Sequence, residues 1–98
     1  MDKEDDNLFE EPVKLPLEDW IDLHTFSPGD IPDLLESYLE ECNEAGLKEV
    51  RIIHGKGIGV QRKIVQKALQ ESPLIEKFTQ APPDAGGWGA TIAILKGK

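Results

Sequence analysis

The chain has 98 residues, of which 39% are hydrophobic and 31% are charged, and its formal net charge is −8. This length allows one domain with the composition of a globular protein. No apolar run approaches the roughly 18 residues of a membrane-spanning helix, and the acidic start differs from a secretory signal. We therefore expect a cytoplasmic protein that does not bind membranes. A single cysteine, Cys42, excludes an internal disulfide and a cysteine-rich zinc site.

The first segment, residues 1–16, combines clustered acidic side chains with two prolines, which predicts an acidic flexible tail. The domain is expected to occupy residues 17–98. At its start, residues 20–24 alternate between apolar and polar side chains, so we predict a short strand. Ile21 and Leu23 would face the core, and Trp20, Asp22 and His24 would share the other face.

Two helices are expected next, with a strand between them. The first runs from residue 31 to about residue 44, with Asp30 as its N-cap and Gly46 as its C-terminal glycine. Residues 48–54 form a nearly continuous apolar run, which predicts a central strand. After the glycines, apolar residues recur at helical spacing up to Ser72 and Pro73, where the second helix ends.

Two further stretches, residues 74–81 and 90–95, have the composition of strands and are separated by a loop rich in glycine and proline. The predicted order is thus β-α-β-α-β-β. Two strand-helix-strand passages favour a parallel pair, and the last strand is expected to return antiparallel beside the third. The fold class we predict is a two-layer α/β sandwich with a mixed four-stranded sheet and two helices.

Charge is unevenly distributed along the chain. Residues 1–19 hold eight acidic and two basic side chains, and residues 30–44 hold six acidic and no basic ones. Residues 48–67, in contrast, carry six basic side chains against Glu49 alone. The stretch around the second strand and the second helix is therefore the positive pole of the domain, where an anionic ligand would bind.

Three titratable side chains are expected to meet at one edge of the sheet. If the first two strands are parallel, Asp22 and His24 end one of them and His54 ends the other, and open α/β sheets bind ligands at that edge. The Asp-x-His spacing suits a carboxylate that orients a general base. It equally suits two metal ligands with His54 as the third, and each residue could instead be a structural group bonded to nearby backbone.

A glycine-rich stretch, HGKGIG at residues 54–59, lies between the second strand and the second helix. Its spacing matches neither a Walker A loop nor a full dinucleotide fingerprint. It is either a simple strand-to-helix turn or a cradle for an anion at the start of the helix. In the second glycine loop, DAGGWGAT, Trp88 is either folded back on the sheet or a platform for stacking on a base.

Taken together, the motifs IDLH, IIHGKGIGVQRKIV and GGWGAT closely resemble the Smr (small MutS-related) domain, over about residues 17–95. The resemblance implies a sandwich like the C-terminal domain of a bacterial translation initiation factor, and nicking or endonucleolytic cleavage of DNA or RNA. The first family motif falls on Ile21 to His24, the second on His54 to Gly57, and a basic residue implicated in cleavage on Arg62. The chain differs from the family pattern at Thr25 and Trp88.

From these observations we predict an endonuclease, with RNA a better substrate than DNA. The alternatives are a nucleic-acid-binding module that does not cleave and a metal-dependent hydrolase that uses Asp22, His24 and His54. No cofactor is expected, although the sequence is compatible with a divalent metal ion. The predicted catalytic residues are Asp22, His24, His54 and Arg62. The predicted phosphate-binding or nucleic-acid-binding residues are Gly55, Lys56, Gly57, Gly59, Lys63, Lys67 and Trp88.

Overall fold

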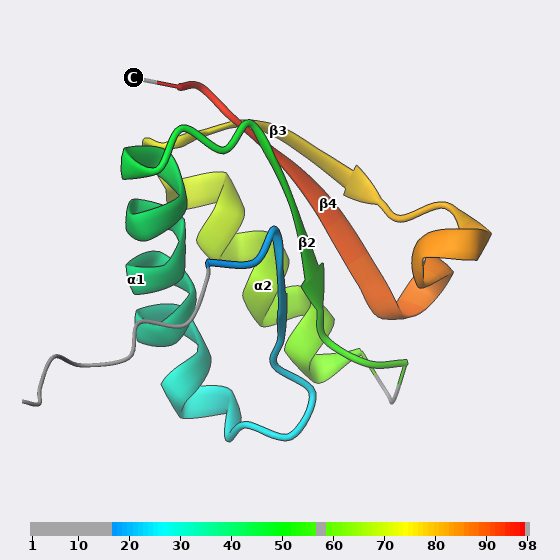
Figure 1. Ribbon diagram of the computed structural model, residues 1–98. Helices are drawn as coiled ribbons and strands as arrows, with labels where there is room; N and C mark the ends of the chain where they lie inside the picture. The colour runs from blue at the N-terminus through cyan, green and yellow to red at the C-terminus, as the bar shows by residue number, and fades with distance from the viewer. Residues whose placement is uncertain (1–16, 57–58, 98) are drawn as a thin grey trace, which may run out of the picture.

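A computed structural model describes residues 17–56 and 59–97. The predicted tail, residues 1–16, and the predicted phosphate-binding residue Gly57 lie outside the described residues. Figure 1 shows a single sheet with both helices on one of its faces, so the chain forms two layers. None of the helices in the described part of the chain is long and apolar enough to cross a bilayer.

The sheet has four strands in the order β1-β2-β4-β3, namely Trp20–Asp22, Glu49–Ile53, Ala90–Leu95 and Ile75–Gln80. β1 and β2 are parallel, whereas β4 is antiparallel to both β2 and β3. The mixed sheet, the central position of β2 and the return of the last strand beside the third are thereby confirmed. β4 also inserts between β2 and β3, so the second helix connects two strands that are not neighbours.

The two helices are α1, Ile31–Glu44, and α2, Val60–Glu71. Gly46 follows α1 with φ of +84° and its N–H donates to the Asn43 carbonyl, which confirms the predicted C-terminal glycine. Asp30 occupies the N-cap position, but its side chain makes no capping hydrogen bond. Its backbone is already helical, because a short 3-10 turn, Pro28–Asp30, leads into the helix.

The core lies between the helices and the covered face of the sheet. Leu35, Leu39 and Cys42 of α1 are fully or almost fully buried there, as are Val65 and Leu69 of α2. The Cys42 thiol is free and buried, and burial raises its pKa. The first turn of α2 lies near the end of β1, because Gln61 bonds to the Leu23 carbonyl.

Candidate functional site

The site lies at the carboxyl ends of β1 and β2, which meet side by side. Asp22 is the register partner of Ile53, and the N–H of Leu23 donates to the Ile53 carbonyl at 2.7 Å. The residues that follow each strand are therefore held together by backbone pairing. The two strand ends thus meet at one edge of the sheet, as predicted, whereas the side chain of His54 does not join the pair formed by Asp22 and His24.

Asp22 and His24 form a hydrogen-bonded pair just beyond β1. Asp22 Oδ1 accepts from the backbone N–H of His24 at 3.0 Å and lies 2.5 Å from His24 Nδ1. The first bond turns the chain, so β1 ends at Asp22. The alternation of side chains in the sequence predicts instead that the strand continues to His24. The His24 hydrogen bonds lower the pKa of Asp22, which keeps the carboxylate ionised.

The geometry of this pair leaves one ring nitrogen of His24 available. A carboxylate at Nδ1 selects the tautomer with the proton on Nδ1, and Nε2 is then free to accept a proton. The side chains of His24 and Asp22 are 53% and 39% exposed, respectively, so a substrate can reach the ring. The arrangement is that of a general base oriented by a carboxylate.

Gly55 brings the glycine-rich segment against this pair. Its φ is +85°, and a Cβ atom at this position would lie 3.1 Å from the Cβ of His24. A side chain would therefore be strained and would press on His24. The glycine permits the backbone after β2 to lie directly beside the predicted base.

His54 is buried, in contrast to His24. Its side chain is 2% exposed, Nε2 lies 2.9 Å from Thr91 Oγ1, and Nδ1 lies 3.2 Å from the Gly55 carbonyl oxygen. Burial lowers the pKa of His54, and the nearby Arg62 acts in the same direction. The ring is thus neutral, with Nδ1–H donating to Gly55 and the Thr91 hydroxyl donating to Nε2. Among the roles that the sequence allowed for His54, this geometry fits a structural histidine that anchors the glycine segment.

An open hollow of about 350 Å³ lies beside this segment, between the glycines and α2. Its lining residues are Pro28, His54, Gly55, Gly59, Val60, Gln61 and Arg62. Gly59 is the N-cap of α2 with φ of +90° and supplies no capping side chain. The first turn of this 12-residue helix therefore presents N–H groups that no side chain of the described residues caps, together with a partial positive charge, beside the hollow, which suits an anion such as a phosphate.

The predicted basic residues differ in their position relative to this hollow. Arg62 lines it and is half-buried, and Lys56 is exposed just beyond Gly55. Lys63 and Lys67 are exposed on α2 outside the hollow, and Lys67 borders a second, more apolar hollow near Pro28. Arg62 is thus the cation closest to a ligand in the hollow, whereas the two lysines can act on a longer polyanion that continues along α2.

Trp88 belongs to the short 3-10 turn Gly87–Gly89, in the loop before β4. Its ring is 47% exposed, and its Nε1–H donates to the Lys56 carbonyl at 3.2 Å. The Arg62 guanidinium carbon lies 4.1 Å from the ring centroid. One face of the indole is therefore occupied by Arg62, which differs from the open platform for a base considered on the sequence.

Gln61 is a site residue that the sequence did not indicate. Its side-chain amide donates to the carbonyls of Leu23 at 3.3 Å and Phe26 at 2.7 Å. These residues flank His24 in the chain. Gln61 therefore ties the segment that carries the predicted base to the first turn of the helix.

Replacing Gln61 with alanine is expected to destabilise the fold by about 1 kcal/mol per lost hydrogen bond. The loop that carries His24 would lose its attachment while every charged group stayed in place. Gln66→Ala is the matched control, because Gln66 lies on the same helix and bonds to none of the described residues by its side chain. Urea unfolding of both variants measures the difference, and equal effects would contradict the role of Gln61.

The metal-ligand reading is not supported by the arrangement of side chains. Within residues 17–56 and 59–97, no three histidine, cysteine or acidic side chains gather in a way that could hold a metal ion. Asp22 and His24 bind each other, and the ring nitrogens of His54 face Thr91 and Gly55. The three residues considered as ligands therefore do not form one site.

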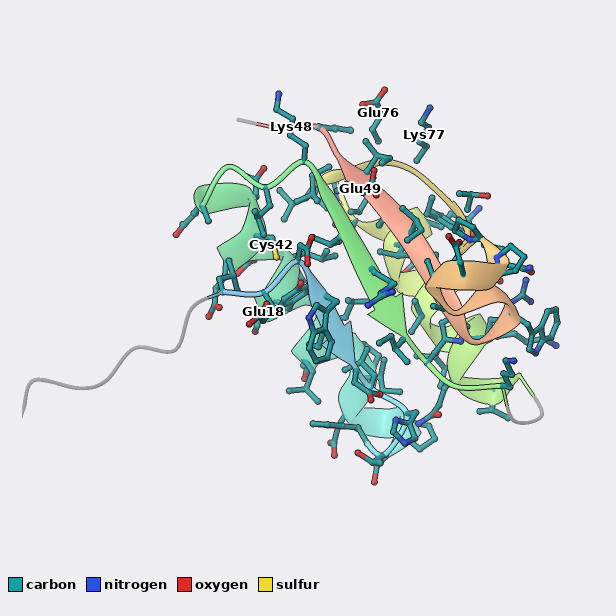
Figure 2. All side chains as sticks on the ribbon, turned by 45° about the vertical axis from the view of Figure 1, so that its right-hand side comes forward. Glu18, Cys42, Lys48, Glu49, Glu76 and Lys77 are labelled. Carbon is teal, nitrogen blue, oxygen red and sulfur yellow. The ribbon has the colours of Figure 1, made fainter. Side chains whose placement is uncertain are left out.

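The opposite end of the sheet has mixed charge. Figure 2 shows Lys48, Glu76 and Lys77 at the end where β3 begins and β4 finishes, with Glu49 nearby. Acidic and basic side chains alternate there, so this end offers no uniform field to an anion. The uncapped helix start and the hollow lie at the other end of β2.

Comparison with known proteins identifies the family to which this small two-layer α/β domain belongs. A family model described as the Smr domain matches residues 21–96, so the chain belongs to the Smr domain family, as the three sequence motifs predicted. Its fold agrees with the crystal structure of the Smr domain of Thermus thermophilus MutS2, at a TM-score of 0.76 and 34% identity over 79% of this chain and 96% of that one.

Further relatives are both free-standing proteins and parts of larger ones. YdaL, a stand-alone small MutS-related protein from Escherichia coli, superimposes with a TM-score of 0.76 and 27% identity over 84% of this chain and 67% of its own. Endonuclease MutS2 of Carboxydothermus hydrogenoformans is 40% identical over 76 residues, and that of Lactococcus lactis subsp. cremoris is 48% identical over 62. The matched regions cover 78% and 63% of this chain, but they span only 10% and 8% of those two relatives.

Proposed function

We propose that this chain binds nucleic acid and cleaves its phosphodiester bonds, with RNA as the better substrate. The observation that carries the proposal is the Asp22–His24 pair, which leaves His24 Nε2 free beside the glycine segment. The MutS2 relatives are named endonucleases, which supports the same reaction class. Nucleic acid offers the phosphates that suit the hollow and the cations around it.

In the proposed reaction His24 is the base. Nε2 removes the proton from a ribose 2′-hydroxyl, whose oxygen attacks the adjacent phosphorus and displaces the 5′-oxygen. The protonated ring can then return the proton to the leaving oxygen, and Asp22 stabilises the ring while it is charged. The products would be a 2′,3′-cyclic phosphate and a 5′-hydroxyl, and RNA is preferred because DNA lacks the attacking group.

The remaining site residues would hold the phosphate. Arg62, Lys56 and the uncapped N–H groups at the start of α2 provide donors for the negative charge that grows on the phosphoryl oxygens. His54 is assigned a positioning role, because it is buried and bonds to the glycine segment. Lys63 and Lys67 would add affinity along the backbone of the substrate. This scheme requires no metal ion.

The test is a substrate panel with the purified chain. Single-stranded and double-stranded RNA and DNA of one sequence, each end-labelled, are incubated with and without EDTA. Cleavage of RNA that EDTA leaves unchanged, and that a single 2′-deoxy substitution at the cleaved position prevents, is expected. The Asp22→Ala/His24→Ala variant controls for contaminating nuclease. Binding without cleavage would favour the non-catalytic module, and loss of cleavage in EDTA would contradict the metal-free scheme.

A further inference from the structure

The contact between Trp88 and Arg62 joins two parts of the chain that are distant in sequence. The guanidinium lies over the indole at 4.1 Å, within the range of a cation–π interaction. Arg62 belongs to the first turn of α2, and Trp88 to the loop that precedes β4. The tryptophan therefore stands where it can determine how the principal cation of the hollow is oriented.

The indole itself is also held at its edge. Its Nε1–H donates to the Lys56 carbonyl, and the neighbouring Gly89 carbonyl accepts from the N–H groups of His54 and Gly55 at 2.9 and 3.0 Å. The Trp88 loop and the glycine segment are thus locked to each other by three hydrogen bonds. Of these three, the bond from Nε1–H to Lys56 holds the ring itself.

Stacking of this kind leaves the guanidinium able to bind an anion. The indole contacts the flat face of the cation, whereas the N–H donors of arginine lie in its plane and point outward at its edge. A phosphate oxygen can therefore bind the edge while the face rests on the ring. The contact also restricts a long side chain that would otherwise lose conformational freedom when it binds.

We propose that Trp88 is a positioning residue that holds the Arg62 guanidinium at the hollow in an orientation ready for a phosphate. The phosphate part of this statement rests on the proposed function, whereas the holding of Arg62 does not. Trp88 thereby acts through Arg62 and not as a platform for a nucleobase. The chain places a large residue in its second glycine loop because the ring has a partner in α2.

The first experiment needs no nucleic acid. In NMR spectra of the free protein, the side-chain protons of Arg62 are expected to show an upfield ring-current shift. Trp88→Leu should remove this shift, because leucine has similar apolar bulk without an aromatic ring, and Trp88→Phe should keep part of it. An unshifted Arg62 in the wild type would overturn the proposal whether or not the protein binds nucleic acid.

The second experiment is a double-mutant cycle on the affinity for a labelled single-stranded RNA. Trp88→Leu alone is expected to weaken binding by about threefold to tenfold, and Trp88→Phe by less. In the Arg62→Ala background, Trp88→Leu should have little further effect. Trp20→Leu is the matched control, because Trp20 is 41% exposed on β1 and makes no contact of this kind with Arg62 in the described residues.

The outcomes separate the two proposals. A full effect of Trp88→Leu in the Arg62→Ala background would show that the ring acts on the RNA directly and would overturn the positioning role. If the wild type binds no RNA, the proposed function fails, and the ring-current shift alone decides whether Trp88 holds Arg62. A shift that is present in the wild type and lost in Trp88→Leu would then still support the contact.

Discussion

Replacing His24 with alanine is expected to lower the rate of RNA cleavage by about a hundredfold or more and to leave RNA affinity almost unchanged. The imidazole is exposed, and its Nδ1 is held by Asp22, so its loss removes the proton acceptor without disturbing the core. The hollow and its cations stay intact. Single-turnover cleavage and a binding titration on the same RNA measure the two quantities separately.

A second substitution tests the role assigned to the Asp22 carboxylate. Asp22→Asn keeps the shape of the side chain, but it removes the charge that stabilises a protonated ring, and cleavage should fall by about tenfold or more. The pKa of Asp22 is lowered from 3.8, so its carboxylate is ionised at neutral and mildly acidic pH. Full activity of purified His24→Ala would contradict the assignment.

Arg62→Ala is expected to have the second largest effect, a loss of about a hundredfold in the rate of the cleavage step. Arg62 is the basic side chain that lines the hollow, and a planar donor near the phosphate stabilises the charge that develops during attack. Arg62→Lys should restore only part of the rate, because lysine keeps the charge without the planar donor edge. Rates at saturating RNA isolate this effect from binding.

The neighbouring lysine provides a matched control for charge. Lys63→Ala removes one positive charge from the same turn of α2, but Lys63 is exposed and does not line the hollow. We expect it to weaken binding modestly, to reduce the salt dependence by about 0.7 in the log–log slope, and to leave the saturated rate unchanged. If Arg62→Ala and Lys63→Ala behaved alike, the net charge of the helix would explain both, and Arg62 would have no specific role.

Local sequence patterns were sufficient to predict most of the fold. Apolar spacing predicted α1 and α2 closely, and Gly46 marked the end of the first helix. The boundaries were less accurate where a side chain competes with the backbone, as when Asp22 ends β1 two residues early. The insertion of β4 between β2 and β3 involves strands that are distant in the chain, and neither composition nor alternation encodes it.

In the candidate site, too, local contacts were predictable from the sequence and contacts between distant residues were not. The Asp-x-His spacing was enough to predict the orienting pair, because Asp22 and His24 are two residues apart and their geometry is local. The contacts of His54 with Thr91 and of Gln61 with Phe26 join residues 37 and 35 positions apart. Such pairings depend on how the loops pack, so the sequence could not distinguish a buried histidine from a ligand-binding one.

By itself the sequence determined the order of elements, the family, the position of the basic stretch in the chain and the pairing of Asp22 with His24, because each depends on residue type and short spacing. Only the tertiary structure decided what Trp88 does. Its ring could have faced solvent, the sheet or a ligand. It contacts Arg62 because the loop before β4 lies close to the start of α2. That approach is a consequence of strand order and side-chain packing, which no local pattern specifies.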